Sequence, residues 1–400
     1  MPATPPRPAS SWHYPDNPVG ARDLRVDFLR GIAMIVMVVA HIEVFSVLNL
    51  LTSERFGLVS GAEGFVIFSG LVLGSVYRSR VPHDGWITTI YRLWSRAWKL
   101  YVVSLCLIIA IYLLALVPFI DAREVVSFTD RGAGISYPLY PTDAVNLPTA
   151  LNLLFYLQVG PHQTQVLGLY VFLLLATPVM LALFNRGKAW LGLGLSWILY
   201  AAFQWHHFRL LDCNFENAFA LPAWQLIFFH GLAVGWFKVE IASYMHGRMK
   251  TLVVGASLLI AIALAFLAQN HTNPFLPEWA RLHAVPAEVF DRIYNGFARK
   301  NTLGPLRVLN DVSLFISLYW LLTVCWKPFY RLFGWYLVPV GQASLYVFIL
   351  HVFVVLAASQ LVRFDLHPDR WLAATAIHAA ALMSLWWMTR KRFLMRIIPT

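Results

Sequence analysis

The chain has 400 residues, of which 59% are hydrophobic and only 13% are charged, whereas about a quarter of the residues in a soluble domain are charged. It also contains 16 Trp, 16 Tyr and 28 Phe, side chains that gather at membrane interfaces. This composition excludes an ordinary soluble protein. The formal charge of +11 does not by itself indicate a nucleic-acid partner, because the basic residues cluster at the ends of the apolar segments.

The first 25 residues are polar and rich in proline, and they lack the apolar region and cleavage site of a signal peptide. We therefore expect residues 1–25 to be a disordered cytoplasmic tail. The three cysteines, Cys106, Cys213 and Cys325, have neither the spacing of a metal site nor that of a disulfide framework, and no metal site is predicted.

Apolar segments of membrane-spanning length recur along the rest of the chain. They lie at about 28–48, 57–77, 99–118, 165–184, 189–205, 221–237, 251–268, 308–325, 336–359 and 371–388. The predicted fold is thus an all-α, polytopic transmembrane protein with about ten spans. Its membrane-embedded domain is residues 26–390, and a basic cytoplasmic tail follows at 391–400. The segment 149–160 is apolar but too short to cross a bilayer easily, which indicates a re-entrant or interfacial helix.

The basic residues orient these spans, because positively charged loops stay in the cytoplasm. Ten spans with both termini cytoplasmic place the basic connections inside and the acidic segments outside. Counting 149–160 as a full span would reverse every later loop, so that alternative is rejected. Two long outer loops result, at about 119–148 and 269–307. The second contains five basic residues against the rule, which suits an anionic acceptor: Arg281, Arg292, Arg299, Lys300 and Arg307.

The first span contains two polar residues of special interest, Arg30 and His41. Eleven residues are close to three helical turns, so both side chains lie on one helix face, about 16 Å apart along the axis. A histidine inside an apolar span is costly to bury and usually has a function. The spacing predicts a cation near one membrane surface and a titratable base deep in the membrane.

Further polar residues fall at matching depths. Glu63, in the second span, is predicted level with His41, which it would orient as the third member of a catalytic triad does. Alternatively, Glu63 pairs with an arginine as a structural element. His351, in the ninth span, has a similar depth. Ser69 lies among small residues of the second span that allow close helix approach.

The remaining candidates have strong structural explanations. Arg92 and Arg96 are four residues apart and share a helix face, where they can bind phosphate groups, but cytoplasmic arginines need no ligand. His230 and His378 are interpreted as residues that hydrogen-bond across helices. Nucleotide-binding loops, a nucleophile elbow and a zinc-protease motif are all absent from the sequence.

These residues resemble the acyltransferase type 3 superfamily of membrane proteins. The Arg–ten residues–His signature matches Arg30 and His41, FSG at 68–70 is similar to a second-span element, and Arg92 with Arg96 resembles an arginine motif of different spacing. Within this superfamily the chain most resembles the OpgC family, which succinylates osmoregulated periplasmic glucans. The supporting stretches are RDLRVDFLRGIAMIVMVVAH, GAEGFVIFSGLVLG, VLGLYVFLLLATPV, LPAWQLIFFHG, LGPLRVLND and GQASLYVFILH.

The resemblance implies an inner-membrane enzyme that takes a donor such as succinyl-CoA from the cytoplasm and a glucan hydroxyl from the periplasm. We therefore expect a transmembrane O-acyltransferase with no permanently bound cofactor. His41 would be the general base and Glu63 would orient it, while acyl-CoA phosphates would dock on the cytoplasmic arginines. Direct transfer of the acyl group and passage through a covalent acyl-histidine are both open. The free carboxylate of a succinyl group would need a cation, either Arg30 or Arg307.

Two other classes of function stay open. A proton-coupled transporter or exporter of a sugar or organic acid also needs buried His and Glu residues, although no pair of internal repeats is evident. A subunit of a glucan-synthesis complex is the third possibility. The small-residue faces allow a homodimer in the lipid bilayer, but they pack equally well within one chain.

Overall fold

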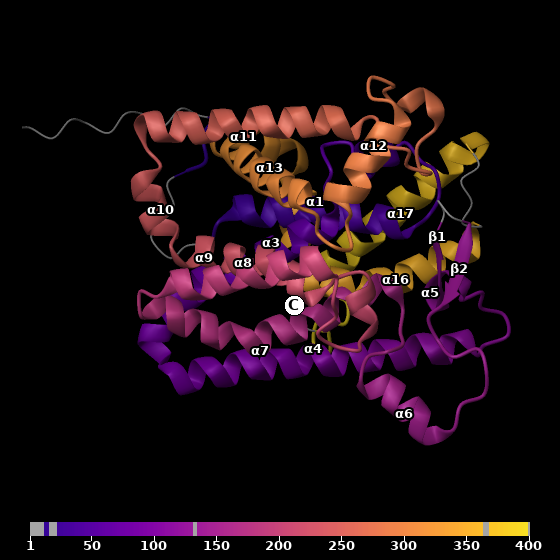
Figure 1. The fold of residues 1–400 in the computed structure, drawn as a ribbon. Coiled ribbons are helices and arrows are strands. Elements are labelled where there is room, and N and C mark those ends of the chain that lie inside the picture. Colours follow the sequence, from indigo (N-terminus) through magenta and orange to yellow (C-terminus); the bar gives the residue numbers. More distant parts are fainter. Residues whose placement is uncertain (1–11, 16–21, 131–133, 363–367, 399–400) are drawn as a thin grey trace, which may run out of the picture.

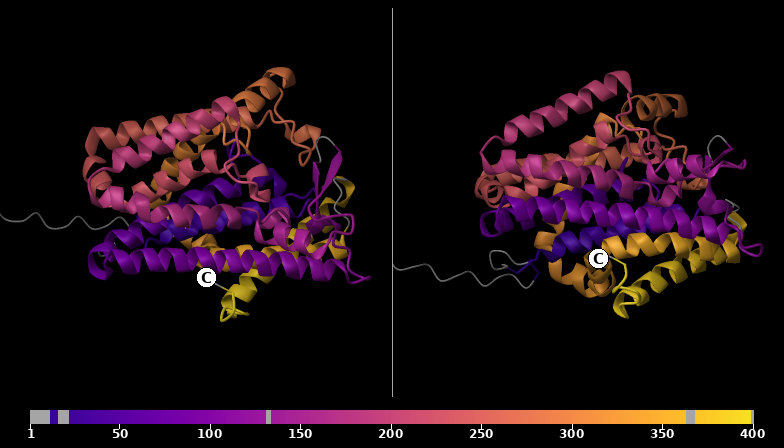
Figure 2. Two further views of the ribbon diagram at one scale, coloured as in Figure 1. Left: turned by 60° about the horizontal axis from the view of Figure 1, so that its bottom comes forward. Right: turned by 90° about the horizontal axis from the view of Figure 1, so that it is seen from below.

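The computed structural model describes residues 12–15, 22–130, 134–362 and 368–398. Long helices lie side by side in a bundle (Figure 1), and two further views keep this alignment (Figure 2). The long helices are α1 (Leu24–His41), α3 (Gly61–Asp84), α4 (Trp86–Ala115), α7 (Val166–Asn185), α8 (Ala189–His206), α9 (Leu221–Trp236), α11 (Gly247–Ala268), α13 (Pro305–Val324), α16 (Ser344–Leu361) and α17 (Trp371–Arg390).

Shorter elements connect these helices. They are α2 (Asn49–Thr52), α5 (Arg123–Val126), α6 (Leu147–Phe155), α10 (Lys238–Tyr244), α12 (Ala287–Ile293), α14 (Trp326–Phe329), α15 (Trp335–Gln342), the 3₁₀ turns η1 (His162–Thr164), η2 (Asn214–Asn217), η3 (Glu278–Ala280) and η6 (Pro368–Arg370), and the π-helical turns η4 (Tyr294–Ala298) and η5 (Tyr330–Gly334).

Every predicted span overlaps a helix, but not every helix is long and apolar enough to cross a membrane. Within the described residues, six helices meet that requirement, or seven if α9 and α10, bent by 76°, form one span. They are α4, α7 with η1, α11, α13, α16 and α17. The chain is therefore a helical, membrane-compatible protein, while the count of ten spans and the cytoplasmic termini stay predictions.

The prediction of an all-α fold is wrong in one loop. Strands β1 (Ser127–Asp130) and β2 (Ile135–Pro138) form an antiparallel pair in the first long outer loop, with Ser127 opposite Pro138. A chain that alternates polar residues with Phe128, Ile135 and Tyr137 favours such a pair, because successive side chains of a strand point to opposite faces. The short helix expected near 149–160 is present as α6, none of whose residues is buried.

The bounds of two predicted spans also differ. Helix α1 ends at His41, although the apolar segment continues to residue 48. The ninth span, 336–359, is two helices, α15 and α16, which are interrupted at Ala343. Most of the predicted tail, 1–25, lies outside the described residues. Its residues 12–15 are held to the bundle, because Tyr14 contacts Trp326 and donates its backbone N–H to Thr323.

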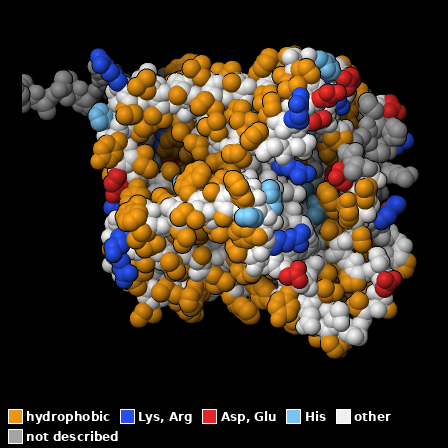
Figure 3. All heavy atoms as spheres, in the orientation of Figure 1, with side chains coloured by type: hydrophobic (Ala, Val, Ile, Leu, Met, Phe, Trp, Pro, Cys, Tyr) orange, Lys and Arg blue, Asp and Glu red, His pale blue; other side chains and the backbone are white. Residues whose placement is uncertain are grey.

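The surface has the character of a membrane protein. On the face shown in Figure 3, hydrophobic side chains cover the middle of the bundle, and charged side chains gather toward its two ends. Exposed apolar residues on α8 and α11 include Leu195, Ile198, Leu259 and Ile262. Loop elements from both predicted outer loops, the β1–β2 pair and α12, lie at the same end of the bundle, whereas α10 lies at the other (Figure 1). A shared outer face requires this arrangement.

Glycines hold the helices of the bundle core in close contact. An added Cβ on Gly74 of α3 would lie 2.0 Å from the carbonyl oxygen of Leu232, and one on Gly235 of α9 would lie 2.0 Å from that of Leu71. Each helix thus presents small residues to the other's backbone, the arrangement that lets membrane helices approach closely. Two of the small residues predicted in the second span pack in the same way, since an added Cβ would lie 2.5 Å from the Ala33 carbonyl oxygen at Gly61 and 2.2 Å from that of Phe228 at Gly70.

We predict that Gly235→Ala destabilises the protein by about 1–3 kcal/mol, because its methyl group would overlap the Leu71 carbonyl and force α3 and α9 apart. Thermal unfolding of the purified protein in detergent measures the effect. Gly255→Ala on α11 is the matched control, since a Cβ there meets no atom within 4 Å among the described residues. Equal melting temperatures for the two variants would contradict the packing role.

Candidate functional site

Two imidazoles from distant parts of the chain meet at the end of α1. The Nδ1 atom of His41, the last residue of that helix, lies 2.9 Å from Nε2 of His351 on α16. The two rings are nearly parallel, with centroids 5.0 Å apart. His351 is completely buried, whereas His41 is half-buried. The predicted residue His351 is therefore the direct partner of His41.

The hydrogen bonds determine which nitrogen of each ring carries a proton. Nδ1 of His351 hydrogen-bonds to the carbonyl oxygen of Phe348, which can only accept. In a neutral His351 ring, Nε2 is then an acceptor, and Nδ1 of His41 must donate to it. This leaves Nε2 of His41 with a lone pair, and it has no hydrogen-bond partner among the described residues. His41 is thus oriented as a base.

A third histidine, His162, completes the cluster. Its ring on turn η1 meets the His41 ring edge-on, with centroids 5.8 Å apart. Its Nδ1 is buried and has no partner within the described part of the chain. Phe128 of strand β1 packs edge-on against the His162 ring, with centroids 5.3 Å apart. The hairpin that the sequence did not predict therefore contacts the histidine cluster at His162.

Glu63 belongs to a different cluster. Its carboxylate accepts from the backbone N–H and the hydroxyl group of Ser60, which caps α3, and it pairs with Arg307 at 3.0 Å. Arg307 also pairs with Glu54 and donates to the carbonyl oxygen of Ala298 at 3.1 Å. Both Arg307 and Glu63 are 0% exposed.

This ion-pair cluster corrects the expectation that Glu63 contacts and orients His41. Counting residues placed Glu63 level with His41, but Glu63 lies in the first turn of α3, where capping and Arg307 occupy its oxygens. In this structure Glu63 instead forms a structural ion pair with an arginine, Arg307, which was the alternative interpretation. Arg307 is likewise engaged by two carboxylates, Glu54 and Glu63.

A cavity brings together three residues predicted from separate parts of the chain. Arg30, Ser69 and Arg96 line it with Tyr170, and its empty volume is about 370 Å³, part of it open to solvent. Arg30 donates to the hydroxyl group of Ser344, at the break between α15 and α16, and lies 3.7 Å from Asp27. The Nε atom of Arg30 is buried without a partner among the described residues. The cavity therefore holds cationic groups with unused hydrogen-bonding capacity.

Aromatic residues connect this cavity to the histidines. Phe65, in the cavity wall, stacks on Phe348 with centroids 5.3 Å apart. Phe348 lies 5.0 Å from the ring of His351 and accepts its hydrogen bond. One pair of stacked rings therefore separates the cavity of Arg30 and Arg96 from the imidazole pair.

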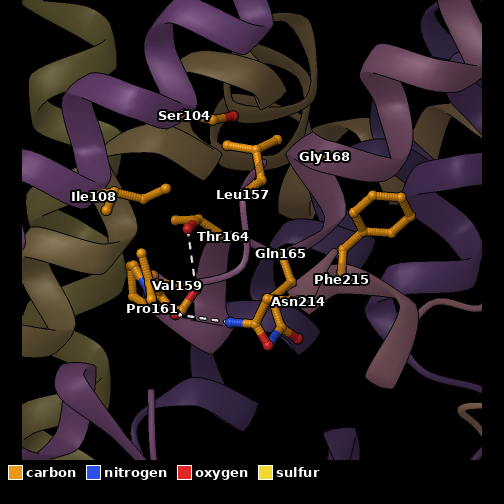
Figure 4. A pocket seen from close by; sticks show the side chains of 11 residues that line it. Ser104, Ile108, Leu157, Val159, Pro161, Thr164, Gln165, Gly168, Asn214 and Phe215 are labelled. Atoms are coloured by element: carbon orange, nitrogen blue, oxygen red, sulfur yellow. Dashed lines mark hydrogen bonds between the residues drawn. The ribbon is translucent and has the colours of Figure 1, made fainter. Parts of the chain in front are cut away.

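A second cavity lies beside the turn that carries His162 (Figure 4). Its empty volume is about 310 Å³, and its polar lining includes Thr164, Gln165 and Asn214. Asn214 accepts from Gln165 at 2.9 Å and donates to the carbonyl oxygen of Gly160 at 3.3 Å. These bonds fix the start of α7 and so help to set the position of His162.

The other candidates have local partners. Arg92 is exposed and pairs with Asp84, so it does not line the cavity that contains Arg96, one turn away on α4. His378 bonds to the hydroxyl group of Ser46 and the carbonyl oxygen of Ile42, and His230 accepts from the indole of Trp197. Cross-helix bonding, as expected, occupies these two histidines. Within the described ranges, no group of three His, Cys, Asp or Glu side chains could hold a metal ion.

His162 is the residue that sequence reasoning missed. It follows the short apolar segment 149–160 and precedes the apolar residues of α7 in a polar stretch, PHQTQ. A histidine directly before a predicted span is the available signal, but outside a span a polar residue does not stand out from its neighbours.

The comparison with protein families identifies the chain. The model of the OpgC protein family matches residues 22–396, nearly the whole chain, and the chain therefore belongs to this family. The family implies an acyltransferase-type enzyme and suggests a role on glucans. Neither a curated protein nor a solved structure matches the chain.

We predict that Arg307→Gln destabilises the protein by about 3–5 kcal/mol, because it leaves Glu54 and Glu63 without their buried cation. Thermal or denaturant unfolding in detergent measures this change. Arg299→Gln, at an exposed position before α13, should unfold like the wild type. A fully stable Arg307→Gln protein would show that the two carboxylates do not depend on Arg307.

Proposed function

We propose that this OpgC-family chain is a transmembrane O-acyltransferase of the bacterial inner membrane. In this proposal it moves an acyl group, succinyl, from cytoplasmic acyl-CoA to a hydroxyl group of a periplasmic glucan. The observation that carries the proposal is the free Nε2 of His41, whose ring is oriented by His351. A general base in that state can accept the proton of an attacking hydroxyl group.

The proposed reaction balances with these groups alone. Nε2 of His41 accepts the proton as the glucan oxygen attacks the thioester carbonyl carbon. The C–O bond forms, the C–S bond breaks, and the departing CoA sulfur receives the proton from His41. His351 keeps its Nε2 lone pair toward His41 throughout, so the transient imidazolium retains a hydrogen-bond acceptor. Glu63 takes no part, and with Arg307 it holds together the segments around the site.

The cavity of Arg30, Ser69 and Arg96 supports a path for the donor. Guanidinium groups bind phosphate through paired hydrogen bonds, and Nε of Arg30 has no protein partner among the described residues. We propose that the CoA phosphates dock near Arg96 and that the thioester arm reaches His41 past Phe65 and Phe348. The acceptor would approach His41 from the side of His162 and the β1–β2 pair.

We predict that His41→Ala lowers acyl transfer by about 10²–10⁴-fold, the usual contribution of a general base. His351→Ala should also lower kcat, because the His41 ring loses the acceptor that fixes its tautomer. His351→Gln, whose amide oxygen can accept from His41, should recover part of this loss. Transfer from succinyl-CoA to a purified glucan, followed by mass spectrometry, measures all three variants.

His246→Ala is the control, since this exposed histidine lies after α10, on the far end of the bundle from the β1–β2 pair. Wild-type turnover by folded His41→Ala protein would end the proposal for that residue. Glucan flux through vesicles without any acyl donor would instead support the transporter.

We predict that Arg96→Gln raises the KM for the acyl-CoA donor and leaves the KM for the glucan unchanged, because Arg96 lines the cavity and Arg92 does not. Arg92→Gln is the matched control, one turn earlier on the same face of α4. Initial-rate kinetics with both substrates varied separately give these constants. An equal increase for the two variants would indicate a general surface attraction for CoA rather than a site at Arg96.

A further inference from the structure

The structure changes which cation can meet the free carboxylate of a dicarboxylic acyl group. Arg307 is already paired with two carboxylates, Glu54 and Glu63, and is 0% exposed. Arg30 is engaged by Asp27 and Ser344, on the side of the cavity. Neither expected residue has a free guanidinium group at the histidine cluster.

Lys300 is a cation near that cluster, and its charge is not paired. It lies close enough to His41 and His162 for its charge to act on both rings. Within the described residues, its ammonium group makes neither a hydrogen bond nor an ion pair. The side chain is half-buried on the turn between η4 and α13. The ammonium group of Lys300 therefore has N–H donors left to bind a ligand.

The turn that carries Lys300 is fixed from three helices. Side-chain donors of α8, α9 and α13 bind its carbonyl oxygens at 2.7–3.2 Å: Tyr200 to Leu303, Gln204 to Thr302, Trp224 to Asn301 and Arg307 to Ala298. The backbone N–H of Leu303 closes the turn on the carbonyl oxygen of Lys300 at 3.0 Å. A backbone held at so many points fixes the place from which the lysine side chain extends.

Two nearby carboxylates act on the charge of Lys300 without contacting it. Burial lowers the pKa of the Lys300 ammonium group, while the charges of Glu63 and Glu54 oppose this shift and that of Arg307 adds to it. The charges of Glu63 and Glu54 thus favour the ammonium form of Lys300 from a distance. Among the described residues, the ammonium group has no partner and is free to donate hydrogen bonds to a ligand.

We propose that Lys300 binds the terminal carboxylate of a dicarboxylic acyl group while His41 acts at the thioester end of the same group. This assignment rests on the proposed acyl transfer. It makes Lys300 a specificity-determining residue that selects a donor with a second carboxylate. The proton accepted by His41 and the bonds that form and break are unchanged, because Lys300 contributes only hydrogen bonds and charge.

The test compares two donors of equal chain length, succinyl-CoA and butyryl-CoA, with one neutral glucan acceptor. For each protein, the ratio of the two kcat/KM values is measured. Lys300→Gln should lower the preference for succinyl at least about 10-fold, the size of a lost charge-assisted hydrogen bond. Lys300→Arg should retain most of the preference. Because both donors are compared within one preparation, a loss of folded protein cancels from the ratio.

Arg299→Gln, next to Lys300 and exposed, is the matched control and should keep the wild-type ratio. An equal loss with both donors would overturn the proposal and indicate that Lys300 stabilises the charge on the thioester oxygen. An unchanged ratio would overturn it as well. If the proposed acyl transfer itself were wrong, the wild-type protein would transfer neither group to the glucan. That result differs from both outcomes that overturn the role of Lys300.

Discussion

The contact between α1 and α15 sets the geometry on which the site depends. A Cβ on Gly31 would lie 2.2 Å from the carbonyl oxygen of Leu337, and one on Gly341 would lie 1.7 Å from that of Asp27, so the two backbones touch. Helix α16 begins three residues after Gly341 and is carried along α1 by this contact. Arg30 consequently meets Ser344, and His41 meets His351. Arg30 precedes His41 on α1, and their partners Ser344 and His351 follow in the same order on α16. The two helices therefore run parallel.

The chemistry of this arrangement separates into two clusters with different tasks. His41 and His351 form a hydrogen-bonded imidazole pair, which the carbonyl group of Phe348 orients. The carboxylates and Arg307 form a buried ion-pair network that joins α3, α13 and the loop before α3. Buried ion pairs contribute little net stability, but removing one partner is strongly destabilising. Such a network therefore fixes the segments around the histidines more than it strengthens the fold.

Local features of the site could be predicted from the sequence because they depend on one helix at a time. Helical spacing placed Arg30 and His41 on one helix, Arg92 and Arg96 on one face of another, and the apolar segments gave the positions of the long helices. The partner of Glu63 could not be predicted in this way. Its arginine is 244 residues away, and counting turns gives the depth of a residue but not the neighbour that it faces.

The same limit explains the other differences. His162 lies in a turn, where no periodicity signals its direction, and Lys300 looked like one of several basic residues of an outer loop. The end of α1 at His41 has no glycine or proline to indicate it in the sequence. The apolar residues beyond position 41 continue the hydrophobic pattern, although the helix stops. Only the tertiary structure distinguishes these cases.

The early end of α1 has an electrostatic consequence for His41. The last carbonyl groups of a helix have no intrahelical donor, and their aligned dipoles give this end the character of about half a negative charge. His41 occupies the final residue of α1, so a proton added to its ring is attracted by the helix end itself. Such an interaction is worth about 0.3–1 kcal/mol when exposed and up to about 2 kcal/mol in partly buried geometries. The backbone of α1 thereby supplies, in part, the negative partner that a carboxylate provides in a catalytic triad.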